Sequence, residues 1–186
     1  MGLDKTLTVE QIGSIVIDAG LVYKNYGELN EKMIGVTRGG NTFNVEPEYK
    51  EVERDGARGK EKGLKRLINL DVQLTTNMQS LTKENIKDAL GCAKVDGNTV
   101  KSKIDIVDDD YLDNITIVGE TMAGEFVKIT IFNAFADEGI EIALEDKEET
   151  VVETTFSAHF DPKADNMDAY EELFEIEYLA ALPVIT

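Results

Sequence analysis

The 186-residue chain carries 37 acidic against 19 basic side chains, and the formal charge of −18 excludes a surface that binds nucleic acid through its phosphates. Hydrophobic residues make up 42% and charged residues 30%, which excludes a disordered or membrane-embedded chain. The single Cys92 excludes an internal disulfide, and the sequence has no signal-like or membrane-spanning stretch. We therefore expect one domain, residues 1–186, that is made in the cytoplasm and has no membrane partner.

The first third of the chain predicts strands and one long excursion. Apolar and polar residues alternate in residues 14–23, 33–37 and 41–52, which is the period that places one face of a strand on a core. Between about 46 and 66 this pattern is lost in the run EYKEVERDGARGKEKGLKR, which holds seven Lys or Arg and three Gly. Because the run begins and ends inside strand-like segments, it predicts an exposed projection, either an extended hairpin or a flexible loop, with Asp55-Gly56 as a turn signal at its tip.

A strand over residues 66–76 follows this excursion. One face of the predicted strand is apolar and the other polar. The apolar set is Leu70, Val72 and Leu74, and the polar set is Asp71, Gln73 and Thr75.

One helix is predicted over about residues 82–90. Thr82 is a suitable N-cap, and Gly91 follows the last turn as a C-terminal stop. Ile86, Ala89 and Leu90 form an apolar stripe along it. A helix of this length is too short to be stable alone, so we expect the stripe to pack on a sheet.

The second half of the chain predicts further strands. Two long ones are expected over residues 125–136 and 151–161, and weaker candidates lie at 102–107, 111–119, 139–144 and 172–178. In the second long strand Val152, Phe156, Ala158 and Phe160 oppose Glu153, Thr155, Ser157 and His159. This number of strands predicts a mainly β fold, a β-sandwich or barrel-like domain with one short flanking α-helix and a long projecting hairpin loop.

The negative charge is concentrated near the C-terminus. Residues 137–177 hold fifteen Asp and Glu but only two Lys, a net charge of −13 that leaves only −5 for the rest of the chain. The block is either a solubilising face or a surface that repels phosphate. The basic excursion is its natural partner, and if the two lie on different molecules they attract head to tail.

The sequence offers little for chemistry. His159 is the only histidine, lies on the polar face of a predicted strand, and has no nucleophile motif beside it. Cys92 follows the helix stop, where a cysteine is usually a small packed hydrophobe. Asp108, Asp109, Asp110 and Asp113 lack the spacing of a calcium loop, and the glycines at 56, 59 and 63 lack the ending of a phosphate-binding loop. We expect no catalytic residue, cofactor or metal, and not an enzyme.

Several stretches, in order, resemble the major tail tube protein of long-tailed bacteriophages and prophages of Gram-positive bacteria. The resemblance rests on IDAGLVYKNYG, on the hairpin region IGVTRGGNTFNVEPEYKEVERDGARGKEKGLKRL, on LTKENIKDALG at the family's helix, and on EFVKITIFNAFADEGIEIALEDKEETVVETTFSAHFDPKADN. It covers most of the chain, and its motifs are structural.

The resemblance implies a β-sandwich with a flanking helix, six copies of which form a ring, and rings that stack into the tail tube of a virion made in a host bacterium. The partners implied are further copies of the chain, the tape-measure and tail-tip proteins, and double-stranded DNA that passes through the lumen without specific binding. The long loop would reach the next ring through Arg54, Asp55, Gly56, Arg58, Gly59, Lys60, Lys62 and Lys65. Two polar strand faces are candidates for an acidic lumen, Asp71, Gln73 and Thr75 or Glu153, Thr155 and Ser157.

Two other functions remain open at this point. An acidic DNA mimic would use the block from Asp137 to Glu177 to occupy a DNA-binding protein, and it would leave the basic excursion unexplained. The tube subunit of a contractile tail or secretion machine would share the fold and the ring.

Overall fold

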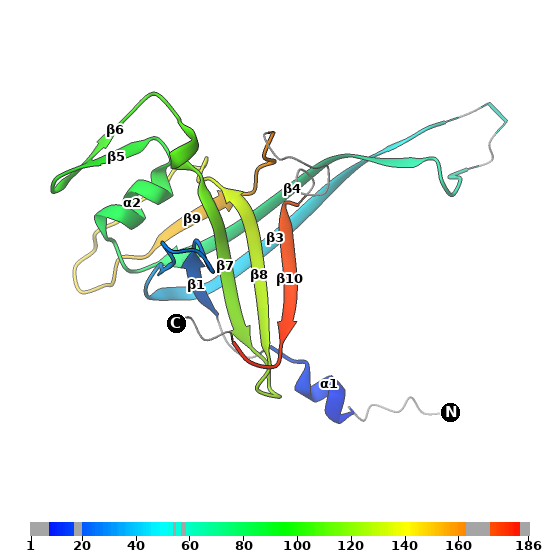
Figure 1. Cartoon of the computed structure of the whole chain (residues 1–186), viewed down its shortest axis with the longest axis horizontal. Coiled ribbons are helices and arrows are strands. Elements are labelled where there is room, and N and C mark those ends of the chain that lie inside the picture. The colour runs from blue at the N-terminus through cyan, green and yellow to red at the C-terminus, as the bar shows by residue number, and fades with distance from the viewer. Residues whose placement is uncertain (1–7, 17–19, 54, 57–58, 163–171, 183–186) are drawn as a thin grey trace.

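The computed structural model describes residues 8–16, 20–53, 55–56, 59–162 and 172–182 (Figure 1). Its strands form a five-stranded sheet, a three-stranded sheet and a small separate hairpin. The five-stranded sheet has the order β10 (Phe174–Leu179), β8 (Phe126–Ala134), β7 (Leu112–Glu120), β1 (Leu21–Lys24) and β2 (Lys32–Met33). The three-stranded sheet has the order β3 (Thr37–Glu51), β4 (Lys65–Met78) and β9 (Val152–Ser157), and the small hairpin joins β5 (Ala93–Asp96) to β6 (Thr99–Ser102).

The predicted mainly β fold with a short helix is confirmed. Both larger sheets contribute to one hydrophobic core, which holds Ile115 and Ile131 from the first sheet and Val72, Leu74 and Phe156 from the second. All five side chains are essentially inaccessible to solvent. The two sheets therefore pack face to face as in a sandwich.

β3 and β4 form one hairpin that is much longer than the body of the molecule requires. Their antiparallel register runs from Thr37↔Met78 at the body to Glu51↔Lys65 near the tip. Figure 1 shows the distal half projecting well away from the two sheets. Of the two forms expected for residues 46–66, the extended hairpin is observed, because the strand ladder continues through Glu51 and Lys65.

The predicted helix is α2 (Lys83–Leu90). The Thr82 side chain accepts a hydrogen bond from the backbone N–H of Asn85 at 3.2 Å, and Gly91 ends the helix at φ 55°. Gly91 is required there for a second reason, because a Cβ atom would lie 2.5 Å from the carbonyl oxygen of Ala136. Neither helix in the described part of the chain is both long and apolar enough to cross a membrane.

The buried face of α2 differs from the prediction. Ala89 is buried, but Ile86 and Leu90 are only half-buried, and the other buried residue is the polar Asn85. Its amide donates hydrogen bonds to the carbonyl oxygens of Ile34 at 2.6 Å and Ser80 at 2.8 Å. The helix is thus attached partly by a buried amide, which an apolar-stripe argument does not find.

Four of the weaker strand predictions were wrong. The segment 33–37 holds only the last residue of β2 and the first of β3, with three residues between them that belong to no strand. In 14–23 only the last residues enter β1, 102–107 lies almost entirely beyond the end of β6, and 139–144 belongs to no strand. The sequence analysis also missed the helix α1 (Val9–Gly13) and the β5–β6 hairpin. A single 3₁₀ turn, η1 (Asp108–Asp110), precedes β7.

Candidate assembly surface

The predicted lumen residues from two distant strands lie on one face of the three-stranded sheet. Gln73 pairs with Ser157 and Thr75 with Thr155 across the β4–β9 ladder, and directly opposite residues in a ladder share a face. The hydroxyl oxygens of Thr75 and Thr155 are 3.0 Å apart. We name this outward surface the polar face; its members are Thr42, Asn44, Glu46, Asp71, Gln73, Thr75, Asn77, Glu153, Thr155 and Ser157.

The polar face has acidic and neutral side chains only. Its carboxylates are Glu46, Asp71 and Glu153, and the remaining members are amides and hydroxyls. The amide of Asn44 donates to Glu46 at 3.0 Å, and the amide of Gln73 donates to Asp71 at 3.4 Å. A surface of this composition offers DNA phosphates no cation to bind.

Two of the six predicted lumen residues are covered in this conformation. Thr155 and Ser157 are 8% and 7% exposed, and the Ser157 hydroxyl donates to the Asp137 carboxylate at 3.0 Å. Asp71 and Glu153 are exposed, whereas Gln73 and Thr75 are half-buried. The open part of the polar face therefore lies over β3, β4 and the start of β9.

Both edges of this sheet are open. β3 pairs only with β4, so one long edge of its fifteen residues has no neighbouring strand in the described part of the molecule. On the other side, the only backbone hydrogen bonds of β9 among the described residues are those between Ser157 and Phe135, of 2.9 and 3.0 Å. Unpaired strand edges are the surfaces through which sheets extend into another chain.

The projecting part of the hairpin, which we call the arm, consists of residues 47–53 and 64–70. Its two faces continue those of the body, but no element of the described chain covers the apolar one. Tyr49 and Leu67, which pair across the hairpin on this face, are 49% and 51% exposed, and Ile68, the extra residue at a register shift beside them, is 55% exposed. The Lys65 ammonium lies over the Tyr49 ring, 4.0 Å from its centroid. A run of uncovered apolar side chains continuous with a core marks an interaction surface.

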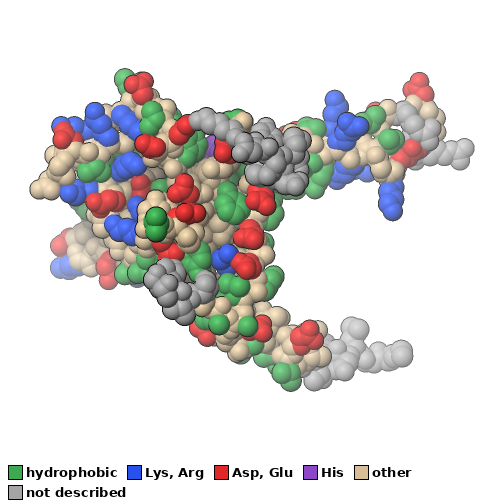
Figure 2. All heavy atoms as spheres, in the orientation of Figure 1, with side chains coloured by type: hydrophobic (Ala, Val, Ile, Leu, Met, Phe, Trp, Pro, Cys, Tyr) green, Lys and Arg blue, Asp and Glu red, His purple; other side chains and the backbone are tan. Residues whose placement is uncertain are grey.

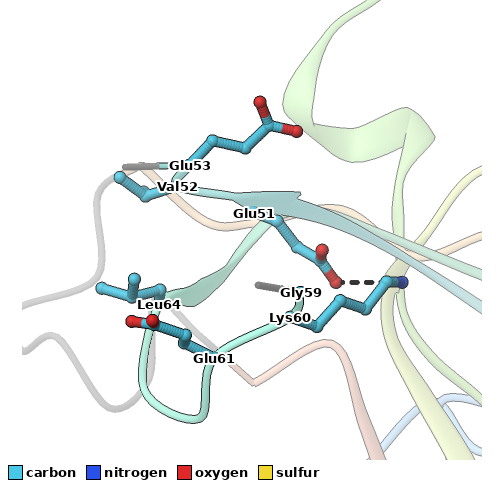
Figure 3. A pocket seen from close by; sticks show the side chains of 7 residues that line it. All are labelled: Glu51, Val52, Glu53, Gly59, Lys60, Glu61 and Leu64. Carbon is cyan, nitrogen blue, oxygen red and sulfur yellow. Dashed lines mark ion pairs between the residues drawn. The ribbon is translucent and has the colours of Figure 1, made fainter. Parts of the chain in front are cut away.

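The arm and the loop at its tip (residues 54–63) together carry seven of the nineteen Lys and Arg side chains, beside five Asp and Glu. Figure 2 shows Lys and Arg side chains gathered on it. Near its tip, Glu51, Val52, Glu53, Gly59, Lys60, Glu61 and Leu64 line a shallow hollow (Figure 3). The Lys60 ammonium is 3.2 Å from the Glu51 carboxylate, and the Val52 N–H donates to the carbonyl oxygen of Leu64 at 2.9 Å. The positive charge that Lys60 brings to the hollow is thus already paired with Glu51 of the same chain.

The predicted inter-ring residues lie at or near this tip. Asp55 and Gly56 form a turn, and Gly59, Lys60 and Lys62 are exposed beside it. Lys65 belongs to β4 instead of the loop, while Arg54 and Arg58 lie outside the described residues. The sequence analysis missed the apolar side of the arm, although the letters Leu67-Ile68 inside a basic run were a visible signal.

The residues considered for chemistry do not form a reactive site. β9 ends at Ser157, so His159 is not on a strand as predicted; its ring lies edge-on to Tyr111 at 5.2 Å, and its Nδ1 is 3.0 Å from the Ser157 carbonyl oxygen. Cys92 is exposed, so its prediction as a packed hydrophobe was wrong, and the neighbouring Ala93 is buried instead. No three His, Cys, Asp or Glu side chains within the described ranges are grouped to hold a metal ion.

The aspartate run is organised by Lys103. In η1 the Asp110 carboxylate forms an ion pair with the Lys103 ammonium and accepts a hydrogen bond from the Val107 N–H at 2.9 Å. Burial alone would raise the pKa of Asp110, but the hydrogen bonds from Lys103 and Val107, together with the positive charge of Lys103, outweigh it and hold the pKa below its usual value. The run is therefore a structural turn at this position.

Comparison with known proteins does not assign the chain to a family. A scan against protein-family models found no matching family, and a search of curated proteins found no matching sequence.

Proposed function

We propose that this chain is a self-assembling structural subunit whose copies join edge to edge into a closed ring. The observation that carries the proposal is the three-stranded sheet, which has open edges on both sides and a polar face without a single Lys or Arg. A contact between two different edges closes into a ring when the rotation from one copy to the next divides a full turn evenly and involves no shift along the axis. The polar face then lines the ring's interior.

Within that class, the function that fits best is the tail tube of a long-tailed bacteriophage, in which six-membered rings stack and DNA passes through the lumen. An acidic lumen repels phosphate at short range and lets the duplex slide. The arm provides the second contact that stacking needs, because its apolar side is uncovered and its basic side chains complement the acidic block of residues 137–177. Tape-measure and tail-tip proteins are the further partners of such a tube.

The test is direct observation of assembly. We expect the concentrated protein, incubated for days with light scattering to follow its mass, to form rings or hollow tubes by negative-stain electron microscopy. Tail-tip proteins are added if it stays monomeric, because tube growth can require an initiator. Continued failure to assemble would contradict the proposal and favour an acidic DNA mimic, and capture of a DNA-binding protein would then be the next assay.

Charge reversal separates stacking from ring closure. Changing Arg54, Arg58, Lys60 and Lys62 to Glu is expected to leave isolated rings and abolish tubes, because the arm tip would then repel the acidic block. The matched control reverses four exposed lysines away from the arm, Lys32, Lys94, Lys101 and Lys147, for the same change in net charge. Intact tubes from the first variant would remove the arm tip from the contact between rings.

A further inference from the structure

The segment between β8 and β9 is close to being a strand without being one. Residues 139–145, which we call the strap, alternate Ile140, Ile142 and Leu144 with polar or small residues, yet the structure assigns them to no strand. Ile140 packs against the hydrophobic core, whereas Ile142 and Leu144 are 43% and 82% exposed. The strap thus has the pattern of a half-buried strand but not its hydrogen bonds.

The chain is already held near β9 before the strap and towards the strap's end. Before the strap, Phe135 and Ser157 exchange two backbone hydrogen bonds, and the Ser157 hydroxyl donates to Asp137. Towards the strap's end, the hydroxyl of Thr150, two residues before β9 begins, donates to the carbonyl oxygen of Ala143 at 3.1 Å. The two segments of the chain, the strap and β9, therefore run antiparallel, and the backbone groups between these contacts are unpaired.

The Phe135–Ser157 pair fixes the register that a complete ladder would have. Counting from it in an antiparallel ladder, Glu153 lies opposite Gly139 and Val151 opposite Glu141. The backbone groups of Glu153 point outward, as those of Ser157 do, and no backbone hydrogen bond reaches them in the part of the chain described. In this register Glu141 joins the polar face, and Ile140 and Ile142 lie on the core side.

Strand direction explains why a ring needs this fourth strand. β3 and β9 are both antiparallel to β4, so they run in the same direction. Copies joined directly through β3 and β9 would pair in parallel, and parallel sheets are rarely left open to water on one face. With the strap added, each copy has four alternating strands, and β3 of the next copy meets the strap in antiparallel pairing.

Charge and backbone freedom explain why the strap is unpaired in the single chain. Closing the ladder makes Glu141 and Glu153 diagonal neighbours on one face, where their like charges repel. It also fixes Gly139, the residue type that loses most conformational freedom on ordering. A second strand on the strap's outer edge supplies the hydrogen bonds that offset both costs.

We propose that the strap closes onto β9 as a fourth strand when copies meet, and that the edge so formed receives β3 of the next copy. The inference rests on the proposed ring function and names the surface that performs it. The isolated chain lacks the completed edge, so it does not polymerise from that side before a neighbour arrives.

The test uses the N–H of Glu141, which donates to the carbonyl oxygen of Val151, the residue before β9, only when the strap has closed. Glu141→Pro removes that donor, and Glu141→Ala keeps it while removing the same carboxylate. We expect both monomers to unfold at the wild-type temperature, the alanine variant to form tubes, and the proline variant to form none. Tubes from Glu141→Pro as abundant as those of the wild type would overturn the strap inference and leave the ring function standing. Failure of both wild type and Glu141→Ala to assemble with tail-tip proteins would overturn the ring function, and the inference with it.

A cross-link keeps the test decisive if the proline variant does not fold. In a Cys92→Ser background, Glu141→Cys with Val151→Cys places two thiols opposite each other in the closed register, where their Cα atoms fall within disulfide range. The control, Ala143→Cys with Val151→Cys, is offset by two residues on the same face. We expect the first pair to oxidise in tubes and the control to stay reduced. Oxidation of the control pair as readily as the first would overturn the register and the inference.

Discussion

The two halves of the β3–β4 hairpin belong to one antiparallel ladder and both hold apolar side chains, but their surroundings are very different. Near the body, Val72 and Leu74 are fully buried against the other sheet, whereas on the arm Leu67 and Tyr49 are about half exposed. The burial of a strand residue is therefore set by the element that packs on its face of the sheet, and not by the strand's sequence pattern. The body half is stabilised within the chain, and the arm half has an apolar side that no element of the described residues covers, as is typical of an interaction surface.

The largest expected effect is in the body half. Leu74→Ala should destabilise the monomer by about 2–5 kcal/mol, because it removes buried methyl groups and leaves a cavity between the sheets. The matched change on the arm, Leu67→Ala, should stay within about 0.5 kcal/mol of the wild type. Urea unfolding followed by circular dichroism measures both. Similar losses at the two positions would mean that the arm is covered within the monomer.

A second contrast concerns ion pairs. In the body, the Asp110 and Lys103 side chains are 5% and 16% exposed, and Asp110→Asn should cost about 1.5–3 kcal/mol because it removes a hydrogen bond to a charged group. On the arm, the Glu51 and Lys60 side chains are 37% and 84% exposed, and Glu51→Gln should cost at most about 1 kcal/mol.

The pH dependence of the Asp110 effect follows from the sign of its shift. The pKa of Asp110 is lower in the folded chain than in the unfolded one, so its stabilisation is complete above the ordinary aspartate pKa. It is lost as the pH falls through the lower, folded value. The difference in unfolding free energy between wild type and Asp110→Asn should therefore shrink below about pH 4. A difference that grows in acid would contradict the ion pair.

The smallest expected change in monomer stability accompanies a loss of assembly. Leu67→Glu places a charge on the uncovered apolar side of the arm, so the monomer should unfold as the wild type does while tube formation fails. Asn69→Glu adds the same charge two residues further along β4, on the polar side because the register shifts between the two positions, and should leave tubes intact. Electron microscopy of both variants, with their unfolding curves, makes the comparison. Normal tubes from Leu67→Glu would show that the apolar side is not a contact.

The sequence predicted the parts of the fold that depend on local chemistry. Alternation located the long strands, and Thr82 with Gly91 located α2, because caps act on their own backbone. It also put Gln73, Thr75, Thr155 and Ser157 on polar faces. The sequence could not show that the two polar faces form one continuous surface, because the pairing of β4 with β9 joins residues roughly eighty positions apart.

The errors have equally physical causes. Residues 139–144 do alternate, but a strand also needs a hydrogen-bonded partner along its edge. Among the described residues, the strap's neighbours are held near β9 only through Phe135–Ser157 and Thr150–Ala143. Asn85 was missed because its amide satisfies backbone carbonyls brought close by tertiary folding. The open edges of β3 and β9 had no sequence signal, since an edge is defined by which strands are absent beside it.

The position of β1 inside the five-stranded sheet has a consequence for synthesis. Leu21 pairs with Val118, roughly a hundred residues later in the chain. At typical translation rates the ribosome needs roughly 5–20 seconds to make that interval, and β1 waits unpaired for its main partner throughout. The β3–β4 hairpin is complete well before then, because its strands are close in sequence. Folding on the ribosome should thus begin at the hairpin, and β1 can dock beside β7 only later, while β8, β9 and β10 are still to be made.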